Sequence, residues 1–190
     1  MAQEVFNKAL QFAIEAHKGM IRKAKKTPFI LHPIEVACII ATMTSDENVI
    51  SAGLLHDTVE DTSVTIEDIE REFGAYIKEL VETETEDKLH HLPAETTWQI
   101  RKEKSLEVLQ ETSDRNVKIL WLADKLSNMR SFYQMYLIQG DELWEEFHQN
   151  DPNKQKWYYT KVLEYTDELK ETAAYKEYED LIGKVFGGDL

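Results

Sequence analysis

The chain has 190 residues, 42% of them hydrophobic, and a formal net charge of −14. This length allows one domain with a sizeable core. The acidic balance argues against nucleic acid as the main ligand, because phosphate backbones are bound by basic surfaces. No apolar run approaches the roughly 18 residues of a membrane span, and the first residues do not form a signal peptide. The single cysteine, Cys38, is expected in the core, excludes a disulfide framework and favours a cytoplasmic location.

Helical periodicity dominates the chain, which contains only 7 glycines and 4 prolines to interrupt it. Pro33 suits the first turn of a helix, Asp46 suits an N-cap, and Thr65 with Asp68 forms a capping-box pattern. No strand pattern is convincing, so we expect an all-α fold. The expected helices cover residues 6–17, 34–43, 47–59, 65–73, 76–81, 98–112 and 117–135, followed by a last third whose aromatic residues mainly pack.

Two segments stand out between these helices. Residues 82–97 are acidic, contain His90 and His91, and lack periodicity, which is typical of a long loop that serves as a lid or binding loop. Residues 17–26 include five of the 22 lysines and arginines. That basic cluster could attract a small polyanion, or it could be a solvated turn.

The most informative feature is the pair His56-Asp57 followed by Glu60-Asp61. On a continuous helix each member of the first pair lies four residues from its counterpart, so all four side chains would share one face. Like charges at this spacing destabilise a helix by about a few tenths of a kcal/mol. We therefore expect a cation to offset them.

Two further stretches supply ligands of the same kind, His32 before Pro33 and Asp124 within Leu-Ala-Asp-Lys-Leu. Two imidazoles and two carboxylates suit manganese, iron or zinc, with magnesium as a competitor. No thiol lies nearby in the sequence, so a structural zinc site is not expected.

These residues, in this order, match the pattern of the HD metallohydrolase superfamily, and the surrounding motifs are more specific. Over about residues 5–180 the chain closely resembles the hydrolase domain of the Rel/Spo alarmone enzymes. The resemblance is carried by six separated stretches: Arg22-Lys23, Thr27-Pro28-Phe29-Ile30, His32-Pro33, residues 54–62, Phe73-Gly74 and residues 122–130. Nothing remains to encode a synthetase domain, so residues 1–190 are expected to form a single, stand-alone HD hydrolase domain.

The resemblance implies a helical bundle with one metal ion in a central cleft. Its ligands would be the residues that match the family's metal site, and the ion would be manganese. Glu60 and Asp61 would face the attacking water. The substrate would be guanosine tetra- or pentaphosphate, which loses its 3′-diphosphate as pyrophosphate and leaves GDP or GTP, lowering the stringent-response alarmone. The implied ligands are His32, His56, Asp57 and Asp124.

The resemblance also implies substrate contacts. Arg22 and Lys23 would pack against guanine, and Asn128 would lie near the water or the ribose and phosphate. Ser131 keeps a hydroxyl where relatives often carry threonine. Lys154 and Tyr158 would contact phosphates and ribose, although a solvated lysine and a core tyrosine are equally compatible with the pattern.

Two departures from the family pattern bear on rate and specificity. Trp121 stands where lysine is usual, and Ser127 stands where histidine or tyrosine is common. Two other functions also stay open. The same metal chemistry could act on another nucleotide, such as the 2′-phosphate of NADPH or a nucleoside monophosphate, or the chain could bind the alarmone without turnover. The partner is expected to be a small guanine nucleotide, with no nucleic acid or membrane.

Overall fold

The computed structural model describes residues 2–22, 26–86 and 94–187. These residues form no β-strand, and their β pairing is limited to an isolated bridge between Ile21 and Pro28. The all-α fold class predicted from the sequence is confirmed. In chain order the elements are α1 (Ala2–Ala16), α2 (Leu31–Ile40), α3 (Glu47–Leu55), α4 (Thr58–Asp61), α5 (Ile66–Phe73), α6 (Ala75–Glu84), α7 (Ala94–Glu111), α8 (Arg115–Gln139), the 3₁₀ helix η1 (Gly140–Glu146), α9 (Pro152–Tyr165), the 3₁₀ helix η2 (Asp167–Leu169) and α10 (Ala173–Phe186).

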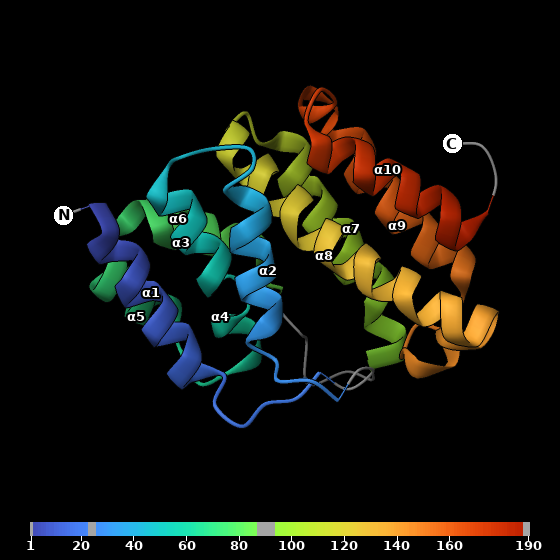
Figure 1. The fold of residues 1–190 in the computed structure, drawn as a ribbon, viewed down its shortest axis with the longest axis horizontal. Helices are drawn as coiled ribbons and strands as arrows, with labels where there is room; N and C mark the ends of the chain where they lie inside the picture. Colours follow the sequence, from blue (N-terminus) through green and yellow to red (C-terminus); the bar gives the residue numbers. More distant parts are fainter. Residues whose placement is uncertain (1, 23–25, 87–93, 188–190) are drawn as a thin grey trace.

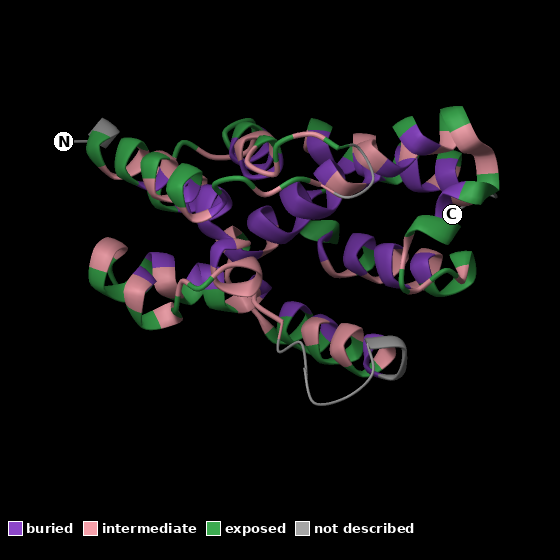
Figure 2. Ribbon diagram, turned by 90° about the horizontal axis from the view of Figure 1, so that it is seen from below, coloured by how far each residue is buried: buried purple, intermediate pink, exposed green. Residues whose placement is uncertain are grey.

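The long helix α8 is the centre of the bundle (Figure 1). Helices α2, α3 and α6 pack against it from the N-terminal half of the chain, and α9 and α10 pack against it from the C-terminal half. Residues 119–127 of α8 are buried without interruption, unlike a surface helix that buries one stripe (Figure 2). Three polar side chains, Asp124, Lys125 and Ser127, are therefore carried into the interior.

Helices α2 and α3 pack closely at Gly53. A Cβ atom at this position would lie 2.5 Å from Ile40 Cδ1, so the end of the Ile40 side chain would have to move, and 3.4 Å from the Ala37 backbone. This packing brings the N-terminal end of α2 and the C-terminal end of α3 near the same part of α8.

The predicted helix signals are present. The Asp46 side chain accepts a hydrogen bond from the Asn48 amide at 2.9 Å. Thr65 and Asp68 form a complete capping box at the start of α5. Pro33 lies in the first turn of α2, where its missing amide hydrogen costs nothing.

One predicted helix is divided in two. The expected helix over residues 47–59 ends at Leu55, and α4 begins at Thr58. Thr58 Oγ1 donates to the Leu55 carbonyl at 2.6 Å, and this bond stabilises the break. The idea that His56, Asp57, Glu60 and Asp61 share one continuous helical face is therefore wrong. His56 and Asp57 form the junction between the two helices.

Two further expectations are corrected. Cys38 is exposed and not part of the core, because α2 buries its other side through Val36, Ala37, Ile39 and Ile40. The expected loop over residues 82–97 is shorter, since α6 continues to Glu84 and α7 begins at Ala94. Residues 87–93, including His90 and His91, lie outside the described residues, and so does the predicted lid.

The helices formed by the described residues include none that is both long and apolar enough to cross a membrane. The aromatic residues of the last third pack as expected. The Phe132 ring contacts Trp144, Phe147 and Tyr159 edge-on at centroid distances of 5.7, 4.9 and 5.4 Å.

Candidate metal centre

Four side chains from three parts of the sequence meet beside the middle of α8. His32 Nε2 lies 3.0 Å from Asp124 Oδ1 and 3.5 Å from Asp57 Oδ2. His56 Nε2 lies 3.2 Å from Asp57 Oδ1 and 3.6 Å from Asp124 Oδ1. One donor atom each from His32, His56 and Asp124 falls within 4.8 Å of the others. The fold thus brings together the four residues singled out as ligands.

The second nitrogen of each imidazole has its own partner. His56 Nδ1 lies 2.8 Å from the Gly53 carbonyl oxygen, to which it must donate. His32 Nδ1 lies 2.8 Å from Ser127 Oγ. In both rings Nε2 is therefore the nitrogen presented to the carboxylates, and His56 Nε2 has no hydrogen-bond partner among the described residues.

The two carboxylates of the cluster are held in their charged form. Burial alone would raise the pKa of Asp124, but the charge of Lys125 holds it well below its usual range. Burial likewise opposes ionisation of Asp57, and the charge of His56 lowers its pKa. His32 has a lowered pKa because burial disfavours its charged form. The carboxylates and His32 are therefore in the protonation states that a metal requires of its ligands. His56 differs, because the charge of Asp57 raises its pKa well above the ordinary value despite burial, so this ring must release a proton to bind a metal.

The donor set fits a divalent ion. Its members are buried or half-buried, and an unpartnered Nε2 of a 2% exposed histidine is aimed at two carboxylates. Imidazole nitrogen combined with carboxylate oxygen suits manganese, iron or zinc, with the carboxylates also tolerating magnesium.

A second layer of charge lies behind Asp124. Lys125 Nζ contacts Asp124 Oδ2 and lies 3.0 Å from Glu84 Oε2. It also lies 4.8 Å from the centroid of the buried Trp121 ring. The Trp121 side chain itself is 1% exposed, so it lies in the interior of the bundle. The sequence gives no spacing signal that links Glu84 to Lys125, because α6 and α8 bring them together only in three dimensions.

The predicted water-handling pair lies on the short helix α4. Glu60 and Asp61 are both half-buried. Glu60 Oε2 accepts a hydrogen bond of 3.4 Å from the backbone amide of Glu86, just after α6. This bond ties α4 to the segment that leads toward α7.

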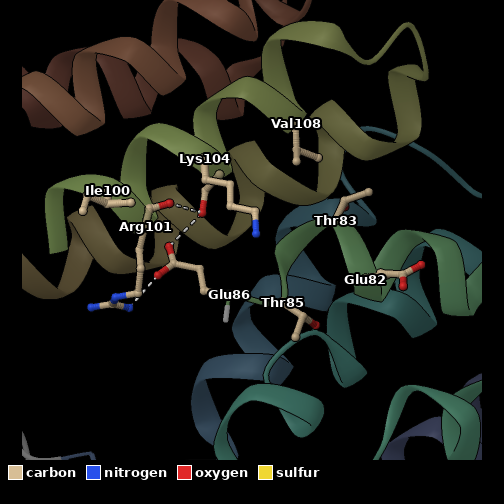
Figure 3. A pocket seen from close by; sticks show the side chains of 9 residues that line it. Glu82, Thr83, Thr85, Glu86, Ile100, Arg101, Lys104 and Val108 are labelled. Carbon is tan, nitrogen blue, oxygen red and sulfur yellow. Dashed lines mark hydrogen bonds and ion pairs between the residues drawn. The ribbon is translucent and has the colours of Figure 1, made fainter. Parts of the chain in front are cut away.

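Glu86 also borders a cavity of about 160 Å³ between the end of α6 and α7 (Figure 3). Its carboxylate accepts from Arg101 at 2.7 Å, Lys102 at 2.6 Å and Ser105 at 3.1 Å. The cavity is not the ligand cluster, whose residues do not line it. Glu86 links α4 to α7, through its amide to Glu60 and through its side chain to Arg101, Lys102 and Ser105.

The predicted substrate residues are held to different degrees. Arg22 donates from Nη2 to Asn128 Oδ1 at 2.7 Å, and Asn128 Nδ2 donates to Asp124 Oδ1 at 2.9 Å. A guanidinium group and a ligand carboxylate are thereby linked through one amide. The Arg22 guanidinium also lies 5.9 Å from the Phe29 ring centroid.

For the remaining predicted substrate residues, no such hydrogen-bonded link to Asp124 is seen among the described residues. Lys23 lies outside the described residues. Ser131 is half-buried one helical turn beyond Ser127 on α8, and Lys154 is exposed on α9. Tyr158 is 2% exposed, with its ring 6.2 Å from Trp98 and 4.7 Å from Lys102 Nζ. Lys154 and Tyr158, expected to act together, thus differ in their access to solvent.

His17 is a neighbour of the cluster that sequence reasoning assigned only to a helix face. It is 2% exposed, its ring packs on Phe29 at 4.8 Å, and neither ring nitrogen has a hydrogen-bond partner among the described residues. Burial lowers its pKa, while the charges of Asp57 and Asp61 oppose the shift. The sequence signal that could have pointed to His17 is its inward-facing position at the end of the first predicted helix.

Comparison with known proteins identifies the family to which the chain belongs. The HD domain model matches residues 9–143. The chain therefore belongs to the HD domain family, and the Rel/Spo resemblance of its motifs is confirmed by its relatives.

Among these relatives, the chloroplastic RSH1 protein of Arabidopsis thaliana is 42% identical over 139 residues, which cover 70% of this chain and 16% of RSH1. The GTP pyrophosphokinase rsh of Brucella abortus strain 2308 is 38% identical over 129 residues, covering 68% and 17% of the two chains. The chain thus spans about a sixth of the length of these relatives.

Two solved structures are similar over most of their own length. A metazoan ortholog of SpoT, described as hydrolysing ppGpp and acting in starvation responses, matches with a TM-score of 0.75 and 29% identity, covering 95% of this chain and 94% of that one. A protein of Listeria monocytogenes EGD-e matches with a TM-score of 0.69 and 32% identity, covering 83% and 94%.

Proposed function

We propose that this chain hydrolyses the 3′-diphosphate of guanosine tetra- or pentaphosphate, releasing pyrophosphate and GDP or GTP. The observation that carries the proposal is the convergence of His32, His56, Asp57 and Asp124 on one buried point within an HD domain. The similarity to a SpoT ortholog described as hydrolysing ppGpp supports this substrate over others.

These four side chains would hold one divalent ion, and we propose manganese. When bound, such an ion acidifies water and stabilises charge that develops on a phosphoryl group. The contribution of the chain is to present Nε2 of both imidazoles and to keep both carboxylates ionised. The Gly53 carbonyl and Ser127 Oγ occupy the other nitrogens, so each ring is held in one orientation.

Glu60 and Asp61 would act as the general base and general acid of the reaction. The oxygen of a water molecule bonds to the phosphorus attached to the ribose 3′ oxygen, and the bond from that phosphorus to the 3′ oxygen breaks. One of the two carboxylates takes the proton from water, and the 3′ oxygen gains a proton as it leaves. The amide of Glu86 donates to Glu60 and holds this carboxylate at the end of α6.

Arg22 and Asn128 would bind the nucleotide on the solvent-facing side of Asp124. The flat guanidinium of Arg22 suits stacking on guanine, and Asn128 keeps it within reach of the ligand cluster. Lys23, Ser131, Lys154 and Tyr158 are proposed as further contacts. A single cysteine without a disulfide framework supports a cytoplasmic setting.

Product analysis tests the proposal. Purified chain with manganese and guanosine tetraphosphate should release pyrophosphate and GDP in equal amounts. If the chain releases orthophosphate from NADPH or a nucleoside monophosphate and no pyrophosphate from guanosine tetraphosphate, the proposed substrate is wrong and the other nucleotide takes its place. If calorimetry detects nucleotide binding but no product forms, the chain is a binding module without turnover.

A further inference from the structure

A chain of side chains leads from His32 to the surface on the side of α8 away from Lys125. His32 Nδ1 lies 2.8 Å from Ser127 Oγ, and Ser127 Oγ lies 2.7 Å from Glu35 Oε2. Glu35 Oε1 accepts from Arg130 at 3.1 Å. Arg130 in turn makes two bonds to the Glu177 carboxylate, at 2.6 and 2.7 Å. The chain thus joins α2, α8 and α10.

The direction of the protons in this chain follows from its chemistry. A carboxylate only accepts, so Ser127 must donate its single hydrogen to Glu35. Ser127 Oγ is then left with lone pairs toward His32, and Nδ1 must be the nitrogen that carries hydrogen. Nε2 is consequently the nitrogen offered to Asp57 and Asp124. Arg130 Nη1 lies 3.1 Å from the other oxygen of the Glu35 carboxylate and is its second donor.

The His56 ring is oriented by a different route. Its Nδ1 donates to a backbone carbonyl, Gly53, three residues earlier on its own helix. The orientation of His56 is therefore built into α3 and does not depend on any other side chain. His32 lies in the first turn of α2, and its ring is oriented by side chains from α8 and from farther along α2.

This difference between the two histidines gives a role to Ser127, which stands where histidine or tyrosine is common in the family. Ser127 is fully buried, and a hydroxyl is the smallest group that can accept from one partner and donate to another. Alanine there would leave the Nδ1 hydrogen of His32 and Glu35 Oε2 without this partner. The ring could then rotate or carry its hydrogen on Nε2, which would block that ligand.

We propose that Ser127 and Glu35 are positioning residues that fix the tautomer and orientation of His32 for metal binding. The inference rests on the proposed metal centre and assigns the departure at position 127 a defined role in it. Ser127 and Glu35 would hold one of the metal ligands in place. Removal of such a partner commonly weakens metal affinity by about 10–100-fold.

The test measures manganese binding directly, by calorimetry and by the electron paramagnetic resonance signal of free manganese. Ser127→Ala should weaken manganese affinity about 10–100-fold. Glu35→Ala should weaken it similarly, because Ser127 then loses the acceptor that directs its hydrogen. The double variant should be no weaker than Ser127→Ala alone, since both substitutions break the same chain. If the losses of manganese affinity in the two single variants add up in the double variant, the proposal is overturned.

Ser51→Ala is the matched control. Ser51 is also fully buried in a helix, α3, but its hydroxyl has no hydrogen-bond partner among the described residues. Its removal should leave manganese affinity unchanged. Glu35→Gln covers the case in which Ser127→Ala does not fold, because Glu35 is half-buried and glutamine keeps an acceptor for Ser127. It should bind manganese more tightly than Glu35→Ala, and a reversed order would contradict the proposal.

The outcomes separate this inference from the proposed function. If the unaltered chain binds no divalent metal, the metal centre itself fails. If the unaltered chain binds manganese and Ser127→Ala binds it equally well, only the positioning role fails. At saturating manganese, Ser127→Ala should retain the KM for nucleotide of the unaltered chain, which a direct substrate contact would not predict.

Discussion

The residues around the Asp124 carboxylate differ in burial. His32, His56 and Lys125 are all buried, each with a partner supplied by the fold, and we call them the buried side. Asn128 and Arg22 are half-buried and connected by single hydrogen bonds, and we call them the front side. The buried side is held by contacts within the fold, while the polar groups of the front side are only half-buried. Substitutions on the two sides should therefore alter different measurable quantities.

Asp57→Ala should have the largest effect on turnover. It removes one of four donors and leaves His56 without its nearest carboxylate, so both manganese affinity and pyrophosphate release should fall, the latter to below about one hundredth of the original rate. The control is Asp180→Asn, which removes a surface carboxylate paired with Lys184 on α10. Turnover at the original rate in Asp57→Ala would show that the chemistry takes place elsewhere.

Glu84→Gln tests the charges behind the cluster through stability. Burial raises the pKa of Glu84 to about 7, from an ordinary value of 4.5. Below pH 4.5 the carboxyl is protonated in both the folded and the unfolded chain. Between the two values the unfolded chain releases its proton first, so the folded state loses stability as the pH rises. Glutamine does not titrate and removes this loss.

The free energy of unfolding of Glu84→Gln, relative to the unaltered chain, should therefore increase between pH 5 and pH 8 by on the order of 2 kcal/mol. Denaturant unfolding at the two pH values measures it. Glu82→Gln, at an exposed position paired with Lys78, is the control and should show no such change. A difference that stays constant with pH would mean that Glu84 is not titrating in this range.

Arg22→Ala should act on the front side alone. The loss of a charged group that faces the nucleotide should raise KM about tenfold, corresponding to roughly 1.4 kcal/mol, with manganese affinity retained. Lys18→Ala is matched to it, because Lys18 belongs to the same basic segment but is exposed and pairs with Glu15. If Arg22→Ala lowers manganese affinity and leaves KM unchanged, the division between the two sides is wrong.

The sequence indicates the residues of the buried side more directly than those of the front side, for a physical reason. A metal centre requires particular chemical types at particular positions, so motif order alone proposes His32, His56, Asp57 and Asp124 as ligands, and the structure brings these residues together. The all-helical fold and the capping box at Thr65 are equally local signals. The split between α3 and α4 was missed because the backbone of His56 and Asp57 stays in the helical region while the hydrogen-bond pattern breaks.

Contacts between distant helices were beyond sequence reasoning. Glu84 with Lys125, and Glu35 with Ser127, are separated by 41 and 92 residues, and neither pair has a characteristic spacing. The exposure of Cys38 was missed because an apolar run does not reveal which side of α2 faces the core. In each case the packing of helices decides the outcome.

Lys154→Ala should have the smallest effect, and its comparison with Tyr158→Phe separates two interpretations of α9. Lys154 is exposed, so if it contacts the phosphates only through solvent-screened charge, its loss should raise KM less than about threefold and less still at high salt. Tyr158 is buried among Trp98, Lys102 and Tyr159, and removal of its hydroxyl should leave KM unchanged unless the site opens toward it. A larger rise in KM for Tyr158→Phe than for Lys154→Ala would mean that the nucleotide reaches the interior face of α9, extending the substrate side of the site past Asn128.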